Sequence, residues 1–432
     1  MTRRFGMVAG AVVAGLLAGC GQQEDLLPGQ REAVRPVEVT ANIAVPFTPP
    51  RQVATPDWTH RGGDADKFVP HPALGNRLTE VWSVDIGEGN GRRHRITADP
   101  IVSGGRIYTI DSRARITATT TAGQVAWQAD LTPATDKADD ASGGGLAAAG
   151  GRIFATSGFG RLAALDAATG EVLWMQRLGA SITTAPTVFG NTVYAVSRDS
   201  RVWALNAETG RISWELPGAP SASSVLGAAA PAVTQRIAVF PLPSGELVAT
   251  LRQSGLRIWA APIQGGRDGK VYSRINDITG DPVVSGGRIY AGNATGRTVA
   301  LSANSGERLW TAREGALGPV QVAGGSVFLV SDQNELVRLD ANTGTRIWGV
   351  DLPLFTATRE RRLRDIYPHF GPVLAGGQLY IASGDELLRA FNPETGALTA
   401  TYPLRGGGAA LPAVANGTLY VVSGDGRLHA FR

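Results

Sequence analysis

The stretch "DPVVSGGRIYAGNATGRTVALSANSGERLW", residues 281–310, decides the fold. It holds three short runs rich in β-branched and aromatic residues, separated by glycine-containing turns, and a Ser-Gly turn then leads to Trp310. Such runs between Gly, Asn and Ser are typical of antiparallel strands, because glycine reaches positive φ and Asx side chains stabilise tight turns. The stretch therefore predicts a unit of four short antiparallel strands.

The same frame recurs along the chain, for example in residues 185–214, 318–348 and 371–400. In six units a glycine stands four positions before a tryptophan: Gly123/Trp127, Gly170/Trp174, Gly210/Trp214, Gly255/Trp259, Gly306/Trp310 and Gly344/Trp348. A period of roughly 40 to 50 residues is too long for leucine-rich repeats and is typical of four-stranded propeller blades. The sequence predicts an all-β fold, a single eight-bladed β-propeller of four-stranded antiparallel blades over residues 57–432.

The two ends of the repeat region complement each other. The eighth unit, residues 411–432, stops after three strands, while residues 78–84 supply a strand that contains Trp82. We expect this N-terminal strand to complete the last blade and close the ring, which removes exposed strand edges. Ala400 stands in the seventh unit where the others have tryptophan. Since an indole can bury about 150–250 Å², one tryptophan per blade indicates packing between blades.

The first 56 residues have a different composition. Arg3 and Arg4 precede an apolar run of about 13 residues, and a bilayer core needs roughly 20. We therefore expect a signal peptide over residues 1–19, exported by the Sec or the twin-arginine route. Residues 20–56 are rich in proline and polar residues, and we expect them to form an extended tether.

Cys20 is the single cysteine of the chain. The order Leu-Ala-Gly-Cys at residues 17–20 resembles the lipobox of bacterial lipoproteins, in which the cysteine carries the lipid. The resemblance implies a palmitate-bearing anchor at Cys20. Gly21 follows in place of the aspartate that retains lipoproteins in the inner membrane, which favours the outer membrane.

The blade frame of Ala-Leu-Asp/Asn, Thr-Gly and Trp resembles the pyrroloquinoline-quinone (PQQ) type propeller repeat over nearly the whole body. Quinoprotein dehydrogenases share that repeat with the BamB family, lipoproteins of the outer-membrane β-barrel assembly (BAM) complex. The lipobox, the lack of an added domain and the tract at 273–292 favour the BamB family. This resemblance implies a non-catalytic, periplasm-facing scaffold without a cofactor. Such a scaffold binds the POTRA domains of BamA and assists the insertion of unfolded β-barrel clients.

In the BamB family, loops between neighbouring blades dock onto BamA. The matching stretches here are residues 221–231, before blade four, and 273–282, before blade five. The residues that the resemblance assigns to this contact are Ser223, Val225, Leu226, Arg274, Asp277 and Thr279. Two of them depart from the family pattern, because Leu226 replaces an arginine and Thr279 an aspartate. A solvated surface pair of Arg274 and Asp277 is the alternative interpretation.

Two other functions stay open at this point: a PQQ-dependent periplasmic dehydrogenase, and a lipoprotein adaptor for another envelope complex. The body has no adjacent cysteines to contact a quinone, and its five histidines show no metal-ligand spacing. The net charge of +4 falls to about +2 without Arg3 and Arg4. The basic clusters at 91–95 and 359–364 fit solvated loops or anionic lipid head groups, and neither fits a nucleic-acid-binding module.

Overall fold

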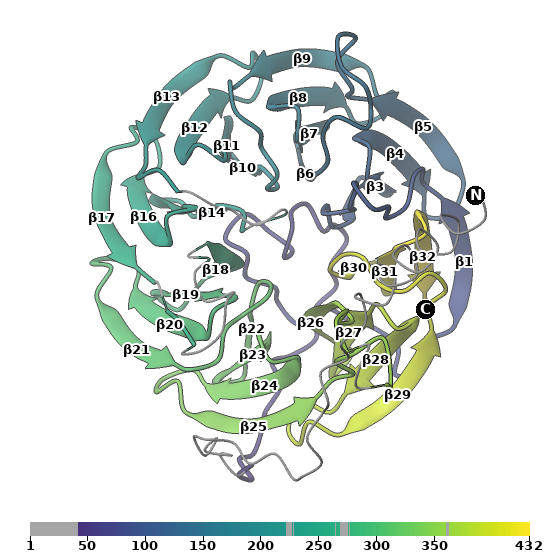
Figure 1. The fold of residues 1–432 in the computed structure, drawn as a ribbon, viewed down its shortest axis with the longest axis vertical. Coiled ribbons are helices and arrows are strands. Elements are labelled where there is room, and N and C mark those ends of the chain that lie inside the picture. Colours follow the sequence, from purple (N-terminus) through teal and green to yellow (C-terminus); the bar gives the residue numbers. More distant parts are fainter. Residues whose placement is uncertain are drawn as a thin grey trace, which may run out of the picture. The chain divides into compact units, whose positions relative to one another are not determined.

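The computed structural model describes residues 42–221, 227, 229–263, 265–267, 275, 277–359 and 363–432. The regular elements within these ranges are β-strands, and they form eight four-stranded antiparallel sheets. Figure 1 shows the sheets arranged as blades around a common axis. The predicted eight-bladed propeller is confirmed.

Within each of blades one to seven, the four strands follow one another in chain order from the axis outward. Blade one has β2 (Ile101–Ser103), β3 (Arg106–Ile110), β4 (Arg115–Thr120) and β5 (Val125–Asp130). Blade two has β6 (Gly144–Ala149), β7 (Arg152–Ser157), β8 (Arg161–Asp166) and β9 (Val172–Arg177). Blade three has β10 (Thr187–Phe189), β11 (Thr192–Val196), β12 (Arg201–Asn206) and β13 (Ile212–Pro217). Blade four has β14 (Ala232–Val233), β15 (Ile237–Pro241), β16 (Glu246–Leu251) and β17 (Arg257–Pro262).

The second half of the ring repeats this order. Blade five has β18 (Ile278–Ser285), β19 (Arg288–Asn293), β20 (Arg297–Ser302) and β21 (Arg308–Ala312). Blade six has β22 (Gln321–Ala323), β23 (Ser326–Val330), β24 (Glu335–Asp340) and β25 (Arg346–Asp351). Blade seven has β26 (His369–Ala375), β27 (Gln378–Ser383), β28 (Leu387–Phe391) and β29 (Leu398–Pro403). Blade eight has β30 (Ala413–Ala415), β31 (Thr418–Ser423) and β32 (Arg427–Phe431), and its outer strand is β1 (Glu80–Asp85).

The ring closes without a covalent turn. β1 pairs antiparallel with β32, and Trp82 lies opposite Ala430. Two backbone hydrogen bonds between Thr79 and Arg432, at 2.8 and 3.0 Å, extend this pairing. The predicted closure of the last blade by the N-terminal strand is confirmed.

The tryptophans pack between blades, as the repeat predicted. The indole N–H of Trp127 donates to the carbonyl of Ala167 in the next blade at 3.1 Å, and Trp259 donates to Ala303 at 3.1 Å. A turn glycine of the next blade lies against each of these rings. Gly306, with φ +71°, leaves room for the ring of Trp259, since a Cβ there would stand 2.6 Å from Cδ2.

The exception at Ala400 has a physical reason. In the other blades the tryptophan covers the turn between the third and fourth strands of the next blade. The blade after Ala400 is blade eight, where this turn is replaced by the meeting of Thr79 and Arg432. The Thr-Gly turn that an indole would cover is therefore absent at this one junction.

Residues 42–56, part of the segment for which a tether was expected, lie on the propeller. The side chain of Asn42 bonds to both the amide (3.0 Å) and the carbonyl (3.2 Å) of Gly349, and the amide of Ile43 donates to Ile347 in the outer strand β25 at 2.8 Å. Arg338 donates to the carbonyls of Val45 at 2.8 Å and Pro46 at 3.1 Å.

The following residues thread the centre of the ring, where Figure 1 shows them as a purple trace. Between residues 55 and 72 this central segment hydrogen-bonds to all eight blades. Its partners, in chain order of the segment, are Asn416 for Thr55, Val102 for Trp58, Ala148 for Thr59, Val188 for His60, Val233 for Ala65, Val284 for Asp66, Gln321 for Val69 and Gly376 for Pro72. The inner strands would otherwise leave backbone groups unpaired at the axis, and the central segment satisfies part of them.

Candidate functional site

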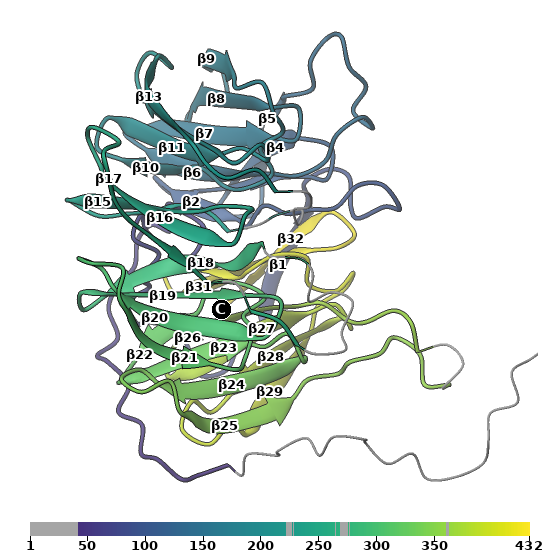
Figure 2. The ribbon, with the colours of Figure 1, turned by 60° about the vertical axis from the view of Figure 1, so that its left-hand side comes forward.

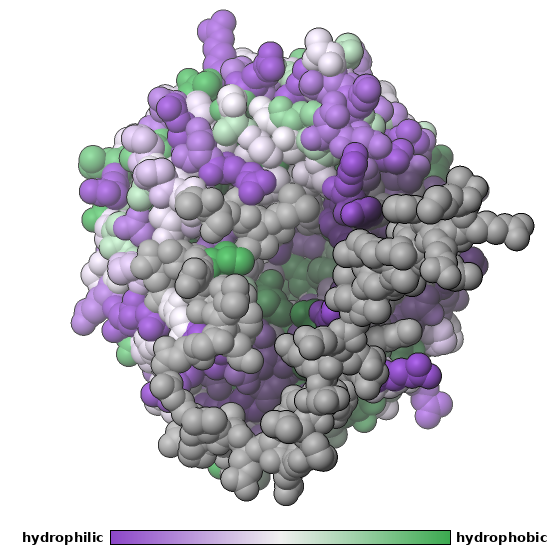
Figure 3. Space-filling view, in the orientation of Figure 1, coloured by the Kyte–Doolittle hydropathy of each residue, from purple (hydrophilic) through white to green (hydrophobic). Residues whose placement is uncertain are grey.

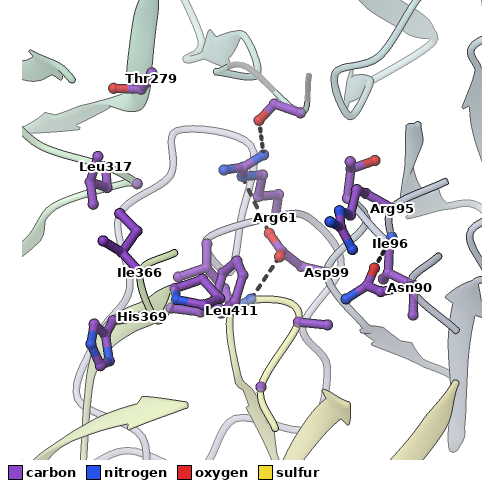
Figure 4. Close-up of a pocket in the computed structure, with 18 residues that line it drawn as sticks. Arg61, Asn90, Arg95, Ile96, Asp99, Thr279, Leu317, Ile366, His369 and Leu411 are labelled. Carbon is purple, nitrogen blue, oxygen red and sulfur yellow. Dashed lines mark hydrogen bonds and ion pairs between the residues drawn. The ribbon is translucent and has the colours of Figure 1, made fainter. Parts of the chain in front are cut away.

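A buried ion cluster lies where the central segment meets blades one and five. The Nε atom of Arg61 stands 3.2 Å from Oδ2 of Asp99 and 3.4 Å from Oδ2 of Asp281. The guanidinium also donates to the carbonyl of Gly227 at 3.2 Å. All three charged side chains are at most about a tenth exposed. Figure 4 shows Arg61 and Asp99 joined at the centre of the site.

The two aspartates occupy equivalent places in the repeat. Each stands immediately before the proline of its blade's innermost strand region, Pro100 just before β2 and Pro282 within β18, and blades one and five face each other across the ring. Oδ1 of Asp99 accepts from the amide of Leu411 at 2.8 Å, and Oδ1 of Asp281 accepts from the amide of Ala230 at 3.0 Å. Both amides belong to the residue before the proline of the preceding blade, so each aspartate also joins two neighbouring blades.

Burial controls the protonation of this cluster. It raises the pKa of Asp99 to about 6, although the nearby Arg61 favours the carboxylate. Burial lowers the pKa of Lys67 to about 8, while Asp281 partly offsets that shift. The Lys67 Nζ atom makes no hydrogen bond to the described residues. The cluster holds two basic side chains, Arg61 and Lys67, and two acidic ones, Asp99 and Asp281, so their formal charges cancel.

A cavity of about 510 Å³ opens next to this cluster. Arg61 and Asp99 form one part of its wall, and Ile96, Leu317 and Ile366 form an apolar part. Further lining comes from Asn90, Arg95, Thr97, Gly227, Thr279, Gly318, Pro368, His369, Phe370, Gly371, Gly408, Ala409 and Leu411. Figure 3 shows a hollow near the middle of this face with apolar residues inside it. The cavity is suited to an apolar group that carries a polar or charged end.

The wall of this cavity holds two arginines that differ in their surroundings. The guanidinium of Arg61 is already placed between two carboxylates, while Arg95 is exposed. Among the residues that the structure describes, no three His, Cys, Asp or Glu side chains are grouped so that they could hold a metal ion.

The structure describes two of the residues predicted to contact a partner. Asp277 is 2% exposed, and Thr279 is 6% exposed and donates to the carbonyl of Ala316 at 2.6 Å. Thr279 also lines the cavity. The other predicted site residues lie outside the described residues: Cys20, Ser223, Val225, Leu226 and Arg274.

The described ends of the two predicted docking stretches lie side by side. The amide of Ala229 donates to the carbonyl of Ile278 at 3.3 Å, in addition to the bond between Ala230 and Asp281. Gly227 of the first stretch and Thr279 of the second both line the cavity. The structure therefore brings together parts of the chain that are about 50 residues apart in sequence.

The ion cluster was not predicted from the sequence. A signal for it exists, because an aspartate precedes the first-strand proline only in "ADPIV" (98–102) and "GDPVV" (280–284). Arg338 was not predicted as a contact residue either; it lies opposite Trp348 in blade six, and the other seven blades have alanine at this position. Among the described residues, no helix has the length and apolar character needed to cross a bilayer.

Comparisons with known proteins agree with this architecture. The relative from Salmonella typhimurium, an outer membrane protein assembly factor BamB, is 32% identical over 261 residues. These are 59% of this chain and 66% of that relative, and the relative from Yersinia pestis is covered to the same extent, so the chain spans just under two thirds of the length of these two relatives.

Two solved structures share the fold. BamB from Moraxella catarrhalis is 19% identical with a TM-score of 0.68, and the match covers 82% of this chain and all of that chain (100%). A quinohemoprotein alcohol dehydrogenase from Comamonas testosteroni is 16% identical with a TM-score of 0.68 over 88% of this chain and 81% of that chain. Likeness at these identities shows the fold alone. The family model for the outer membrane protein assembly factor BamB, by contrast, matches residues 112–350 and 355–432 of this sequence. The chain therefore belongs to the BamB family.

Proposed function

We propose that this chain is a non-catalytic scaffold for outer membrane protein assembly. A lipid on Cys20 holds it at the periplasmic side of the outer membrane, and the loops before blades four and five bind the POTRA domains of BamA. There it assists the insertion of unfolded β-barrel proteins. Membership of the BamB family supports the assembly role, since the matched relatives carry that name.

The observation that carries the proposal is the pairing of the two docking stretches. Hydrogen bonds join Ala229 to Ile278 and Ala230 to Asp281, and Arg61 binds the carbonyl of Gly227. A partner that contacts one stretch therefore also meets the other. The hydrogen-bonded ends of the two stretches lose little conformational entropy when a partner binds them, which favours a specific contact.

The burial of Asp277 changes the role that we propose for it. A carboxylate that is 2% exposed offers little surface to a partner. We therefore assign to Asp277 the positioning of the loop before blade five, and we assign the direct contact to Leu226 and its neighbours. This division of roles predicts different results for substitutions at the two positions.

The test measures the affinity of the full mature chain, with Cys20→Ser, for the purified POTRA domains of BamA. Leu226→Asp is expected to weaken binding at least tenfold without changing the melting temperature. Asp277→Asn is expected to weaken binding and also to lower the melting temperature. The control is Leu256→Asp, since Leu256 is 65% exposed near the outer edge of blade four. Failure of the wild-type chain to bind would refute the proposed partner.

A further inference from the structure

The apolar wall of the cavity continues onto a projecting hairpin. Phe355 and Ile366 form an antiparallel bridge at the base of this hairpin, of which residues 354–359 and 363–366 are described. Ile366 is 53% exposed, and Leu317, Leu354 and Phe355 are each close to 40% exposed. Figure 4 shows Leu317 and Ile366 next to each other at the same side of the cavity. Leu317 and Ile366 line the cavity, and Phe355 lies opposite Ile366 in the bridge, so these three side chains form a surface patch, the hairpin patch. Such patches on soluble proteins commonly mark interaction sites.

Arginines stand on two sides of this patch. Arg95, which is exposed, lines the cavity on the side opposite Ile366 (Figure 4). Arg364 is exposed on the hairpin, two residues before Ile366. The described part of the hairpin carries Arg359 and Arg364 against Asp365. Both basic clusters of the sequence therefore have members around one apolar cavity.

The path of residues 42–56 favours a protein over a membrane as the partner of this patch. Asn42 and Ile43, the first described residues after the expected lipid site, pair with the outer strand β25. Figure 2 shows residues 42–56 passing on the side of the ring opposite to the one from which the hairpin projects. Among the described residues, the segment 42–56 therefore does not lie on the face that carries the hairpin patch.

We propose that the axial cavity and the hairpin patch form one groove for an acidic polypeptide stretch of the partner. A bulky apolar side chain of that stretch inserts between Leu317 and Ile366, and flanking carboxylates pair with Arg95 and Arg364. The inference rests on the proposed function, because Gly227 and Thr279 of the docking stretches line the same cavity. The groove thus extends the BamA contact from blades four and five across the axis to blade seven.

The experiment uses the full mature chain with Cys20→Ser and the POTRA domains of BamA. Ile366→Glu is expected to weaken binding at least tenfold, because a carboxylate in the groove repels the acidic stretch and removes the apolar contact. Leu398→Glu is the matched control, since Leu398 is 54% exposed on the outer strand β29. Arg364→Glu is expected to reduce the salt dependence of binding, while Arg257→Glu on the outer strand β17 leaves it unchanged.

The outcomes separate this inference from the proposed function. If the wild-type chain binds and Leu226→Asp weakens binding, while Ile366→Glu and Arg364→Glu bind like wild type, the groove is refuted and the proposed function stands. If the wild-type chain does not bind, the proposed function fails. A photo-crosslinking residue at position 366 gives an independent readout. Crosslinks to an acidic stretch of a POTRA domain support the groove, and crosslinks only to lipid vesicles overturn it.

Discussion

Replacement of Arg338 by alanine is predicted to release the start of the described chain from blade six. Alanine is the residue that the other seven blades have at this position, so the strand itself tolerates it. The loss is confined to the contacts of the guanidinium. Two of these hold the N-terminal segment, namely the bonds to the carbonyls of Val45 and Pro46, and the same group lies 5.2 Å from the ring centre of Phe47.

The size of the effect follows from these two bonds. Hydrogen bonds from a charged donor contribute about 1.5–3 kcal/mol each. Val45 and Pro46 are at least partly exposed, so their carbonyls regain water when the segment opens, which reduces the loss. We expect the free energy of local opening of this segment to fall by about 2–3 kcal/mol. This corresponds to roughly 30- to 150-fold faster exchange of its amide hydrogens.

Hydrogen–deuterium exchange measures this opening directly. The reporting amides are those of Ile43, which donates to Ile347, and Gly349, which donates to Asn42. Arg288→Ala is the matched control, because Arg288 donates to the carbonyl of Ala341 at 2.8 Å and is not bonded to the N-terminal segment. Unchanged exchange at these amides in Arg338→Ala, or equal changes in both variants, would refute the reasoning.

Three further perturbations test other parts of the structure. Gly306→Ala is expected to lower the free energy of unfolding by about 2–4 kcal/mol in urea denaturation, because it combines a positive φ with contact to Trp259. Gly286→Ala, with φ +57° and open space around the added Cβ, should cost less. The pKa of Asp99 is raised from 3.8 to about 6, so the folded state binds this proton more tightly and stability falls as pH rises from 4 to 6. Between pH 4 and pH 6 the free energy of unfolding of the wild-type chain should fall by up to about 3 kcal/mol more than that of Asp99→Asn. Cys20→Ser is expected to move the protein from the membrane fraction to the soluble fraction and to remove the lipid mass.

The fold could be predicted because its determinants are local and repeated. Each glycine that stands four positions before a tryptophan marks one turn and one contact with a neighbouring blade. This spacing recurs often enough for the blades to be counted. Even the closing strand was placed within two residues, since residues 78–84 were expected and β1 spans Glu80–Asp85. The missing tryptophan at Ala400 was visible in the sequence. Its reason could be given only from the structure, in which Thr79 and Arg432 pair in blade eight where the other blades have a turn.

The ion cluster could not be predicted, because its members come together only when the ring has closed. Arg61 lies in a stretch without a repeat pattern, and Asp99 and Asp281 are 182 residues apart. Asp99 and Asp281 meet at Arg61 only across the axis. A proline-rich composition also does not distinguish a free tether from a segment that binds along a surface, so the contacts of residues 42–56 with blade six were not foreseen.

The central segment connects the docking stretches with the part of the chain that leads to the expected lipid site. Arg61 belongs to this segment, yet it holds Gly227 in the docking stretch before blade four and pairs with Asp281 before blade five. The same segment continues back to Asn42, where the chain leads toward the expected lipid site. Because it is hydrogen-bonded to all eight blades, the chain near the anchor and the docking stretches belong to one connected framework. A change that loosens the central segment should therefore weaken partner binding even where no docking residue is altered.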